Sequence, residues 1–133
     1  MLKRLVALCC SVILSTSFVI GTSTSAAVIP PDRPTYSYTS DCSSSLSISG
    51  STATCESKLL GYSGTTTKIV VKQILQKNNS GRWEDICSWT HTSYTFFASV
   101  TNYKYSLTSG TYRLKSVFTV YSGSNYETIT KYS

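Results

Sequence analysis

Charged residues, and acidic ones above all, are scarce in this chain of 133 residues. They make up 14% of it, with six Asp and Glu against twelve Lys and Arg, whereas ordinary soluble domains carry about a quarter. After the first thirty residues no apolar stretch is long enough to span a bilayer. With 41% hydrophobic residues, the composition excludes a multispan membrane protein and argues against a fully disordered chain. The length allows one domain.

Groups that could carry catalysis are equally scarce. His91 is the one histidine, and on a strand it would lie about 13 Å from Cys87, too far for a nucleophile and its base. Glu84 and Asp85 are adjacent, so on a strand they would point to opposite faces, whereas glycosidases need two carboxylates across a cleft. No Gly-x-Ser-x-Gly elbow and no metal-ligand spacing occurs. We therefore predict no catalytic residue, no metal site and no cofactor.

Residues 1–27 are typical of a secretory signal peptide. Lys3 and Arg4 form a cationic start, an uncharged apolar run follows, and small residues lead up to Ala27. Ser and Thr interrupt the run, which argues against a membrane anchor, and the run continues past Cys9 and Cys10, which argues against a lipid anchor there. We expect cleavage after Ala26 or Ala27 and a freely secreted chain with ten basic and six acidic residues.

Residues 28–41 contain three prolines and are expected to form an extended leader. From 42 to 133 the hydrophobic pattern has a period of two, with turn signals about every ten to twelve residues. The expected strands are Ser45–Ile48, Thr52–Leu60, Thr67–Gln76, Arg82–Thr90, Tyr94–Val100, Tyr112–Tyr121 and Tyr126–Tyr132, with a shorter run at Tyr103–Leu107. This pattern predicts an all-β fold, an immunoglobulin/fibronectin-like antiparallel β-sandwich of about seven strands, with a small open barrel as the alternative.

The segment before the most regular strand, Ser109 to Leu114, resembles the start of strand F in immunoglobulin-like domains. By that resemblance Tyr112 is a buried corner residue whose hydroxyl bonds to nearby backbone. Leu114 stands where antibody domains carry a cysteine, so the usual bridge between the sheets is missing. Tyr112, Leu114, Phe118 and Trp89 are predicted to be structural residues of the core.

A second resemblance covers nearly all of the chain after the predicted signal peptide. The segments that carry it are Ser51–Cys55, Gly61–Thr65, Leu75–Lys77, Ser109–Arg113, Val120–Gly123 and Glu127–Ser133. In these the chain resembles small secreted proteins of Gram-positive bacteria that form a domain family of unknown function. The resemblance implies secretion and a sandwich-like domain, and it implies no activity.

Three cysteines remain after the predicted cleavage, which allows one disulfide and one free thiol in an oxidising environment. We favour Cys42–Cys55, across the first hairpin, over Cys55–Cys87, which would join the second and fourth strands. Strand alternation is expected to place Cys87 on one face with Trp83, Asp85 and Trp89, protected within a monomer.

Aromatic residues are the one positive indication of binding, because exposed rings stack on sugars or anchor protein interfaces. The candidates are Trp83, Tyr62, Tyr121 and Tyr126. The basic residues alternate along the expected strands, on solvated faces, without the dense cluster that nucleic acids require, so no nucleic acid is expected as a partner. Stable insertion into a membrane is not expected either.

These observations predict a secreted, non-catalytic interaction module whose partner is an unidentified extracellular protein or glycan. A carbohydrate-binding module is the first alternative, and it requires a planar row of exposed aromatic residues. A secreted hydrolase, toxin or antimicrobial is the second, and a hydrolase requires a cleft that gathers His91 with an acid.

Overall fold

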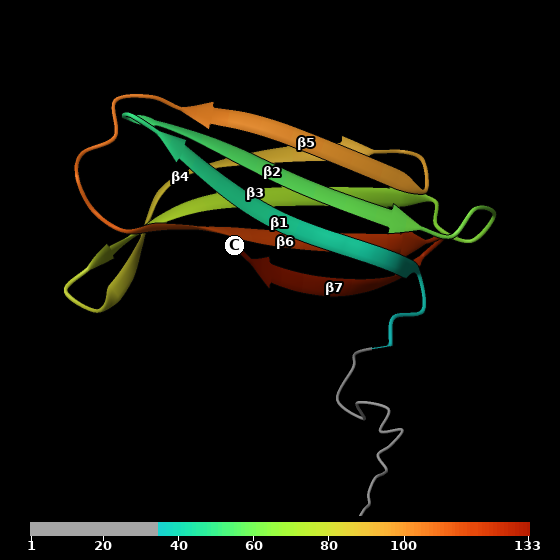
Figure 1. Cartoon of the computed structure of the whole chain (residues 1–133). Helices are drawn as coiled ribbons and strands as arrows, with labels where there is room; N and C mark the ends of the chain where they lie inside the picture. The colour runs from blue at the N-terminus through green and yellow to red at the C-terminus, as the bar shows by residue number, and fades with distance from the viewer. Residues whose placement is uncertain (1–34) are drawn as a thin grey trace, which may run out of the picture. The chain divides into compact units, whose positions relative to one another are not determined.

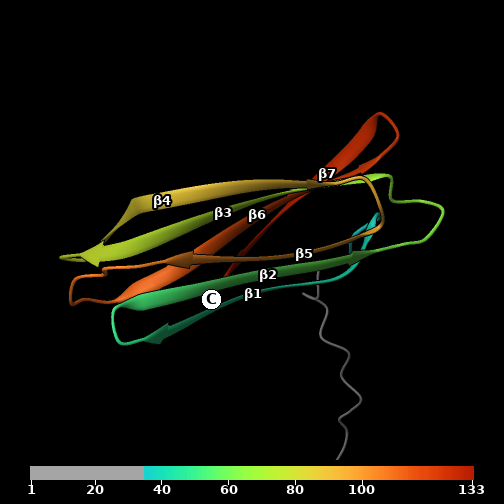
Figure 2. The ribbon, with the colours of Figure 1, turned by 90° about the horizontal axis from the view of Figure 1, so that it is seen from above.

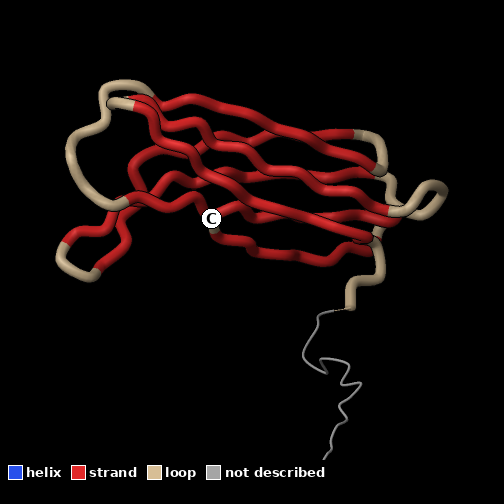
Figure 3. The backbone as a smooth tube through the Cα atoms, viewed as in Figure 1, coloured by secondary structure: helices blue, strands red, loops and turns tan. Residues whose placement is uncertain are grey.

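A computed structural model describes residues 35–133, and strands joined by turns and loops account for this whole range (Figure 3). The strands are β1 (Thr39–Ser49), β2 (Thr52–Gly61), β3 (Lys68–Asn79), β4 (Arg82–Ser93), β5 (Phe97–Lys104), β6 (Tyr112–Ser122) and β7 (Asn125–Tyr132). The described part of the chain contains no helix with the length and apolarity that a bilayer crossing requires. The predicted signal peptide, residues 1–27, lies outside the described residues.

Two antiparallel sheets pack face to face, with the order β1-β2-β5 in one and β4-β3-β6-β7 in the other (Figures 1 and 2). Strand β4 pairs with β3, whereas in constant-type immunoglobulin domains the fourth strand belongs to the sheet of the first two. The predicted seven-stranded sandwich is confirmed, and the two separate sheets exclude the barrel alternative.

The sandwich begins earlier than the sequence pattern suggested. Strand β1 starts at Thr39, inside the predicted leader, and Tyr36 and Tyr38 already pack against the core. Both Glu127 carboxylate oxygens accept backbone N–H groups of this segment, those of Ser37 and Tyr38, each at 2.9 Å. The domain therefore includes residues 36–41 of the predicted leader, and residues 28–34 lie outside the described residues. The predicted run Tyr103–Leu107 is not a separate strand, because β5 continues to Lys104.

The core consists of two apolar clusters with a polar layer between them. The larger cluster contains Leu59, Ile69, Val71, Ala98, Val100, Phe118, Val120 and Ile129. The smaller one contains Ala53, Cys55, Leu75 and Leu114. Ser57, Gln73 and Ser116 occupy the inward positions between the two clusters on β2, β3 and β6, and all three are fully buried.

Hydrogen bonds connect this layer, which we call the polar belt, across both sheets. Ser116 Oγ lies 2.6 Å from Ser57 Oγ and 2.8 Å from Ser44 Oγ. Gln73 Nε2 donates to Ser57 Oγ at 2.8 Å, and Asn102 Nδ2 donates to Gln73 Oε1 at 2.8 Å. Every member has a partner, as buried polar groups require.

A β-bulge in β4 changes which side chains face the core. Leu75 pairs with Cys87 and Gln76 pairs with Asp85, so Ile86 is an extra residue in β4. Cys87 and Trp89 face inward, whereas Asp85 and Trp83 face outward. The expectation that all four share one face was wrong, because the bulge shifts the alternation by one residue. Beyond the bulge the β3–β4 hairpin projects past the end of the sandwich (Figure 1).

Candidate binding face on the four-stranded sheet

The outer face of the β4-β3-β6-β7 sheet carries cations in its middle strands and aromatic rings toward its ends. Strand alternation places Lys68 and Lys72 of β3 and Arg113 and Lys115 of β6 on this face. By register, Lys72 and Lys115 lie near its middle, and Lys68 and Arg113 lie toward opposite ends. The rings are Trp83 of β4, Tyr121 of β6, and Tyr126 and Tyr132 of β7. We call these eight residues the basic face.

The positive charge of the basic face is not neutralised by neighbouring acids. Alternation places one carboxylate on this side of the sheet, that of Asp85, and its Oδ1 accepts a hydrogen bond from Gln76 Nε2 at 2.8 Å. Within residues 35–133 one ion pair is found, and it lies on the other sheet. Lys58 Nζ is 3.5 Å from Glu56 Oε2. The four cations of the basic face therefore have no carboxylate partner in the described part of the chain.

One end of the basic face is formed where β3 begins and β6 ends. Lys68 Nζ lies 4.2 Å from the centre of the Tyr121 ring, within the range of a cation–π contact. Tyr126, on the neighbouring strand, lies 5.6 Å from Tyr121 with the rings tilted by 41°. Tyr126 is 63% exposed, so this end is open to solvent.

The other end is organised around Arg113. Its guanidinium carbon lies 4.3 Å from the Trp83 ring and 4.3 Å from the Tyr132 ring. Its Nε donates to Gln76 Oε1 at 2.7 Å. The bulge in β4 makes this contact possible, since without the extra residue Trp83 would face the core.

Three of the four predicted binding residues, Trp83, Tyr121 and Tyr126, lie on the basic face, and Tyr62 lies apart from them in the loop between β2 and β3. The sequence reasoning missed the cations, which were assigned only to solvated faces. Alternation within β3 and within β6 indicates that the cations of each strand lie on its outward side. The sequence does not show that β3 and β6 are neighbours, and only this pairing brings the cations onto one surface.

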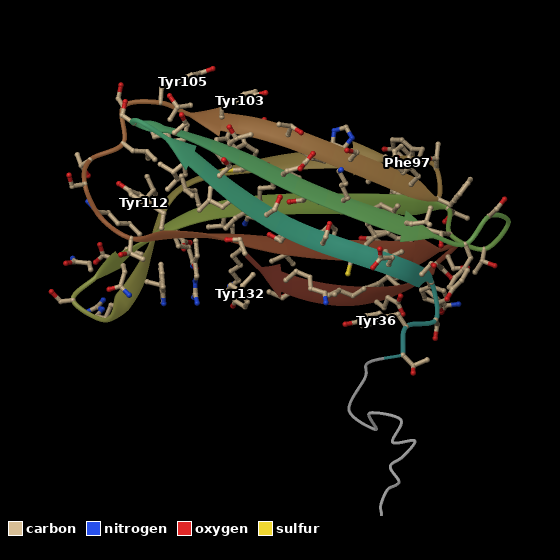
Figure 4. The ribbon with its side chains drawn as sticks, viewed as in Figure 1. Tyr36, Phe97, Tyr103, Tyr105, Tyr112 and Tyr132 are labelled. Carbon is tan, nitrogen blue, oxygen red and sulfur yellow. The ribbon has the colours of Figure 1, made fainter. Side chains whose placement is uncertain are left out.

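Other exposed aromatic residues lie on the β5 side of the sandwich, away from Tyr132 (Figure 4). The rings of Tyr103 and Tyr105 are stacked, with centres 6.3 Å apart and planes 20° apart. Phe97 shares the outward side of β5 with Tyr103 but is six residues away, about 20 Å along the strand. The stacked pair lies at one end of β5, and Phe97 lies at the other end with the exposed Tyr94 and Phe96 just before it, so these rings do not form the continuous planar row that the carbohydrate-binding alternative requires.

The residues predicted to be structural lie in or beside the core. Leu114 and Phe118 are fully buried, and Trp89 and Tyr112 are half-buried and pack against the smaller cluster. Tyr112 is thus less buried than expected, although its hydroxyl donates to the Thr108 carbonyl at 2.6 Å. Figure 4 shows it where the loop after β5 enters β6.

The Cys42–Cys55 disulfide predicted from the sequence is wrong for this fold. Cys42 lies opposite Leu59 and Cys55 lies opposite Leu46, so the two cysteines are four positions apart along the hairpin, about 13 Å. A disulfide needs Cα atoms within about 7 Å. All three described cysteines are free thiols.

Cys55 and Cys87 both belong to the region of the smaller apolar cluster. Burial, and to a lesser extent the nearby Cys87, raises the pKa of the Cys55 thiol to about 11. Burial also raises the pKa of Cys42 and of Cys87. A raised pKa keeps a thiol protonated and therefore weakly nucleophilic at neutral pH.

A cleft of about 370 Å³ lies between β4 and β5 at the open edge of the sandwich. Its lining consists of Trp89, Thr90, His91, Ser99, Val100, Thr101 and Asn102, and so contains His91 without a carboxylate or a thiol. Within residues 35–133 no three His, Cys, Asp or Glu side chains gather in a way that could hold a metal ion.

Comparisons of the sequence with family models and with curated proteins find no match. Among solved structures, the solution structure of CsgH from R. palustris is similar, with a TM-score of 0.42 and 15% sequence identity over 68% of this chain and 87% of that chain. The strand pairing of this chain itself establishes the sandwich fold.

Proposed function

We propose that this protein is a secreted, non-catalytic binding module that holds an acidic polysaccharide outside the cell through its basic face. The observation that carries the proposal is the set of four unpaired cations on one sheet face that has a single carboxylate. A face with one sign of charge attracts a partner of the opposite sign.

The shape of the basic face favours a long, linear partner. Arg113 pairs with Gln76 and Lys68 pairs with Tyr121, so the cations extend over eight residues of strand, about 26 Å. A single small anion would meet only one or two of them. A polymer with an anionic group in each repeat can meet all four.

The aromatic rings of the basic face contact the protein's own cations, and this favours a ligand that is recognised by its charge over one that stacks on the rings. Tyr121 lies under Lys68, and both Trp83 and Tyr132 lie against Arg113. Single-stranded nucleic acids bind through bases stacked on open ring faces. Here rings are engaged by the protein's own cations, which favours a ligand that is bound through its charges.

Binding of the purified protein to polygalacturonate, and to the same polymer with its carboxylates methyl-esterified, tests the proposal. We expect binding to the acid form alone, weakening as NaCl rises from about 50 to about 500 mM, because salt screens exposed charges. The combined change Lys68→Gln and Lys72→Gln should weaken binding about tenfold. The matched control is Lys58→Gln with Lys104→Gln, which removes the same charge outside the basic face and should leave binding unchanged.

Equal binding to the esterified polymer, or a control pair that weakens binding as much as the basic-face pair, would contradict the proposal. So would tighter binding to single-stranded DNA or to anionic lipid vesicles. Shortening of the polymer during incubation would contradict the non-catalytic assignment. Secretion is tested by the mass of the protein in the culture medium, which should correspond to cleavage after Ala26 or Ala27.

A further inference from the structure

The side chain of Arg113 is held in a fixed position on the outer surface of the sheet. Two aromatic rings contact its guanidinium, Trp83 and Tyr132, each at 4.3 Å. Strands β4 and β7, which carry these rings, are the two outermost strands of the sheet, with β3 and the Arg113-bearing β6 between them. The rings therefore approach the guanidinium from either side and restrict its rotation.

A hydrogen-bond chain through the buried Gln76 sets the direction in which the guanidinium points. Arg113 Nε donates to Gln76 Oε1 at 2.7 Å, and Gln76 Nε2 donates to Asp85 Oδ1 at 2.8 Å. Gln76 is 6% exposed, so it supports Arg113 from beneath the surface and is itself closed to solvent. Asp85 fixes the orientation of the Gln76 amide, and the amide in turn fixes Nε.

This arrangement leaves one recognition edge of the guanidinium free. Arginine has five N–H donors, and the structure engages the one on Nε with Gln76. The two Nη groups have no hydrogen-bond partner within residues 35–133. Their outer N–H bonds are parallel, which matches the two oxygens of a carboxylate.

We infer that Arg113 is a carboxylate-binding subsite, so that the ligand of the basic face is a polysaccharide of uronic acids. The inference rests on the proposed function and adds the chemical identity of the anionic group. A planar carboxylate lies in the plane of the guanidinium, between the flanking rings. A sulfate can also present two oxygens to this edge, but its other substituents extend out of that plane toward the rings, so we expect a sulfated polymer to gain less from the planar pair of donors.

Arg113→Lys keeps the charge but removes the planar pair of donors. We expect the variant to bind polygalacturonate about tenfold more weakly than the native protein and to lose clearly less of its binding to dextran sulfate. Arg82→Lys is the matched control, since it makes the same exchange at an exposed arginine of β4 outside the basic face and should leave both affinities unchanged. Gln76→Met, which removes the acceptor that orients Nε, should weaken polygalacturonate binding in the same selective way.

A second measurement does not depend on the stability of the variants. In the native protein, monomeric galacturonate should shift the side-chain NMR signals of Arg113, whereas its methyl ester should not. The inference is overturned if galacturonate leaves these signals unchanged, or if Arg113→Lys binds polygalacturonate as tightly as the native protein. The proposed function survives those results provided that the Lys68 and Lys72 pair still weakens binding. Failure of the native protein to bind any acidic polymer overturns both.

Discussion

At the scale of single residues, Tyr112, the first residue of β6, holds this strand to the loop after β5. Its hydroxyl donates to the carbonyl of Thr108, four residues earlier, while its ring packs against the smaller apolar cluster. Lys77, which pairs with Tyr112 across the sheet, donates to the Thr108 hydroxyl at 2.6 Å. The corner is thus fixed by one ring and two hydrogen bonds.

Tyr112→Phe should lower the free energy of unfolding by about 0.5–1.5 kcal/mol, because it removes one hydrogen bond and leaves the ring in place. Tyr112→Ala should cost several times more, because the packing is lost too. Thermal denaturation measures both changes. Tyr94→Phe, at a position 78% exposed, is the control and should have no effect. An alanine variant with the native melting temperature would show that Tyr112 does not stabilise the corner.

Cys55 should make the protein less stable as the pH rises from about 9 to 11. Its pKa is raised from an ordinary value of 9.0 to about 11 by burial, so in this range the folded state holds a proton that the unfolded state releases. The contribution of the protonated Cys55 thiol to the free energy of unfolding is fully present below pH 9. It is lost as the pH rises through 11. Melting temperatures across this range should fall less steeply for Cys55→Ala. Parallel curves for the two proteins would exclude the effect.

At the scale of the strands, the polar belt couples the two sheets at mid-core. Gln73 of β3 bonds to Ser57 of β2 through Nε2 and accepts from Asn102 of β5 through Oε1. These bonds fix β3 against two strands of the opposite sheet. A wholly apolar interior would leave the sheets freer to slide, because dispersion contacts are not directional.

Gln73→Leu should lower the free energy of unfolding by about 1–3 kcal/mol, since it leaves Asn102 without its acceptor and Ser57 with one partner fewer. Urea denaturation provides the measurement. In a double-mutant cycle with Asn102→Ala, the two effects should be smaller together than their sum, because both remove the same bond. Thr101→Ala, at an exposed position beside Asn102, controls for changes in β5. Strictly additive effects would mean that the belt does not act as a unit.

At the scale of the whole molecule, the charge is distributed unequally over the two sheets. The outer face of the four-stranded sheet carries four unpaired cations. The outer side of the three-stranded sheet carries Lys58 paired with Glu56. Repulsion between two basic faces opposes self-association through them, and this supports the prediction of a monomer.

The native protein should therefore be a monomer without a disulfide between chains. Cys87 is half-buried beside the smaller cluster, and burial raises the pKa of its thiol, so its reaction with other chains should be slow. Light scattering after size exclusion, electrophoresis without reductant and thiol labelling measure this directly. A linked dimer that disappears in Cys87→Ser would refute it and would make dimerisation part of the function.

Much of the fold follows from the sequence by itself, because side chains on a strand alternate between a buried and a solvated face. The pattern in Tyr112–Tyr121 identifies β6 and its inward residues, among them Leu114 and Phe118. The Asn78–Gly81 turn is equally local, since Ser80 and Gly81 both adopt positive φ and Asn78 Oδ1 accepts from Gly81 N–H. Local chemistry determines such features without reference to the rest of the chain.

The tertiary structure decided what depends on register and on strand order. The disulfide prediction failed because the hairpin register separates Cys42 from Cys55. The extra residue Ile86 in β4 turns Trp83 outward toward Arg113, and alternation alone could not locate that bulge. Cations on β3 and β6 became one surface only because these strands are neighbours, although about forty residues separate them in the chain. Pairing between distant strands is a property of the whole fold, and no local pattern encodes it.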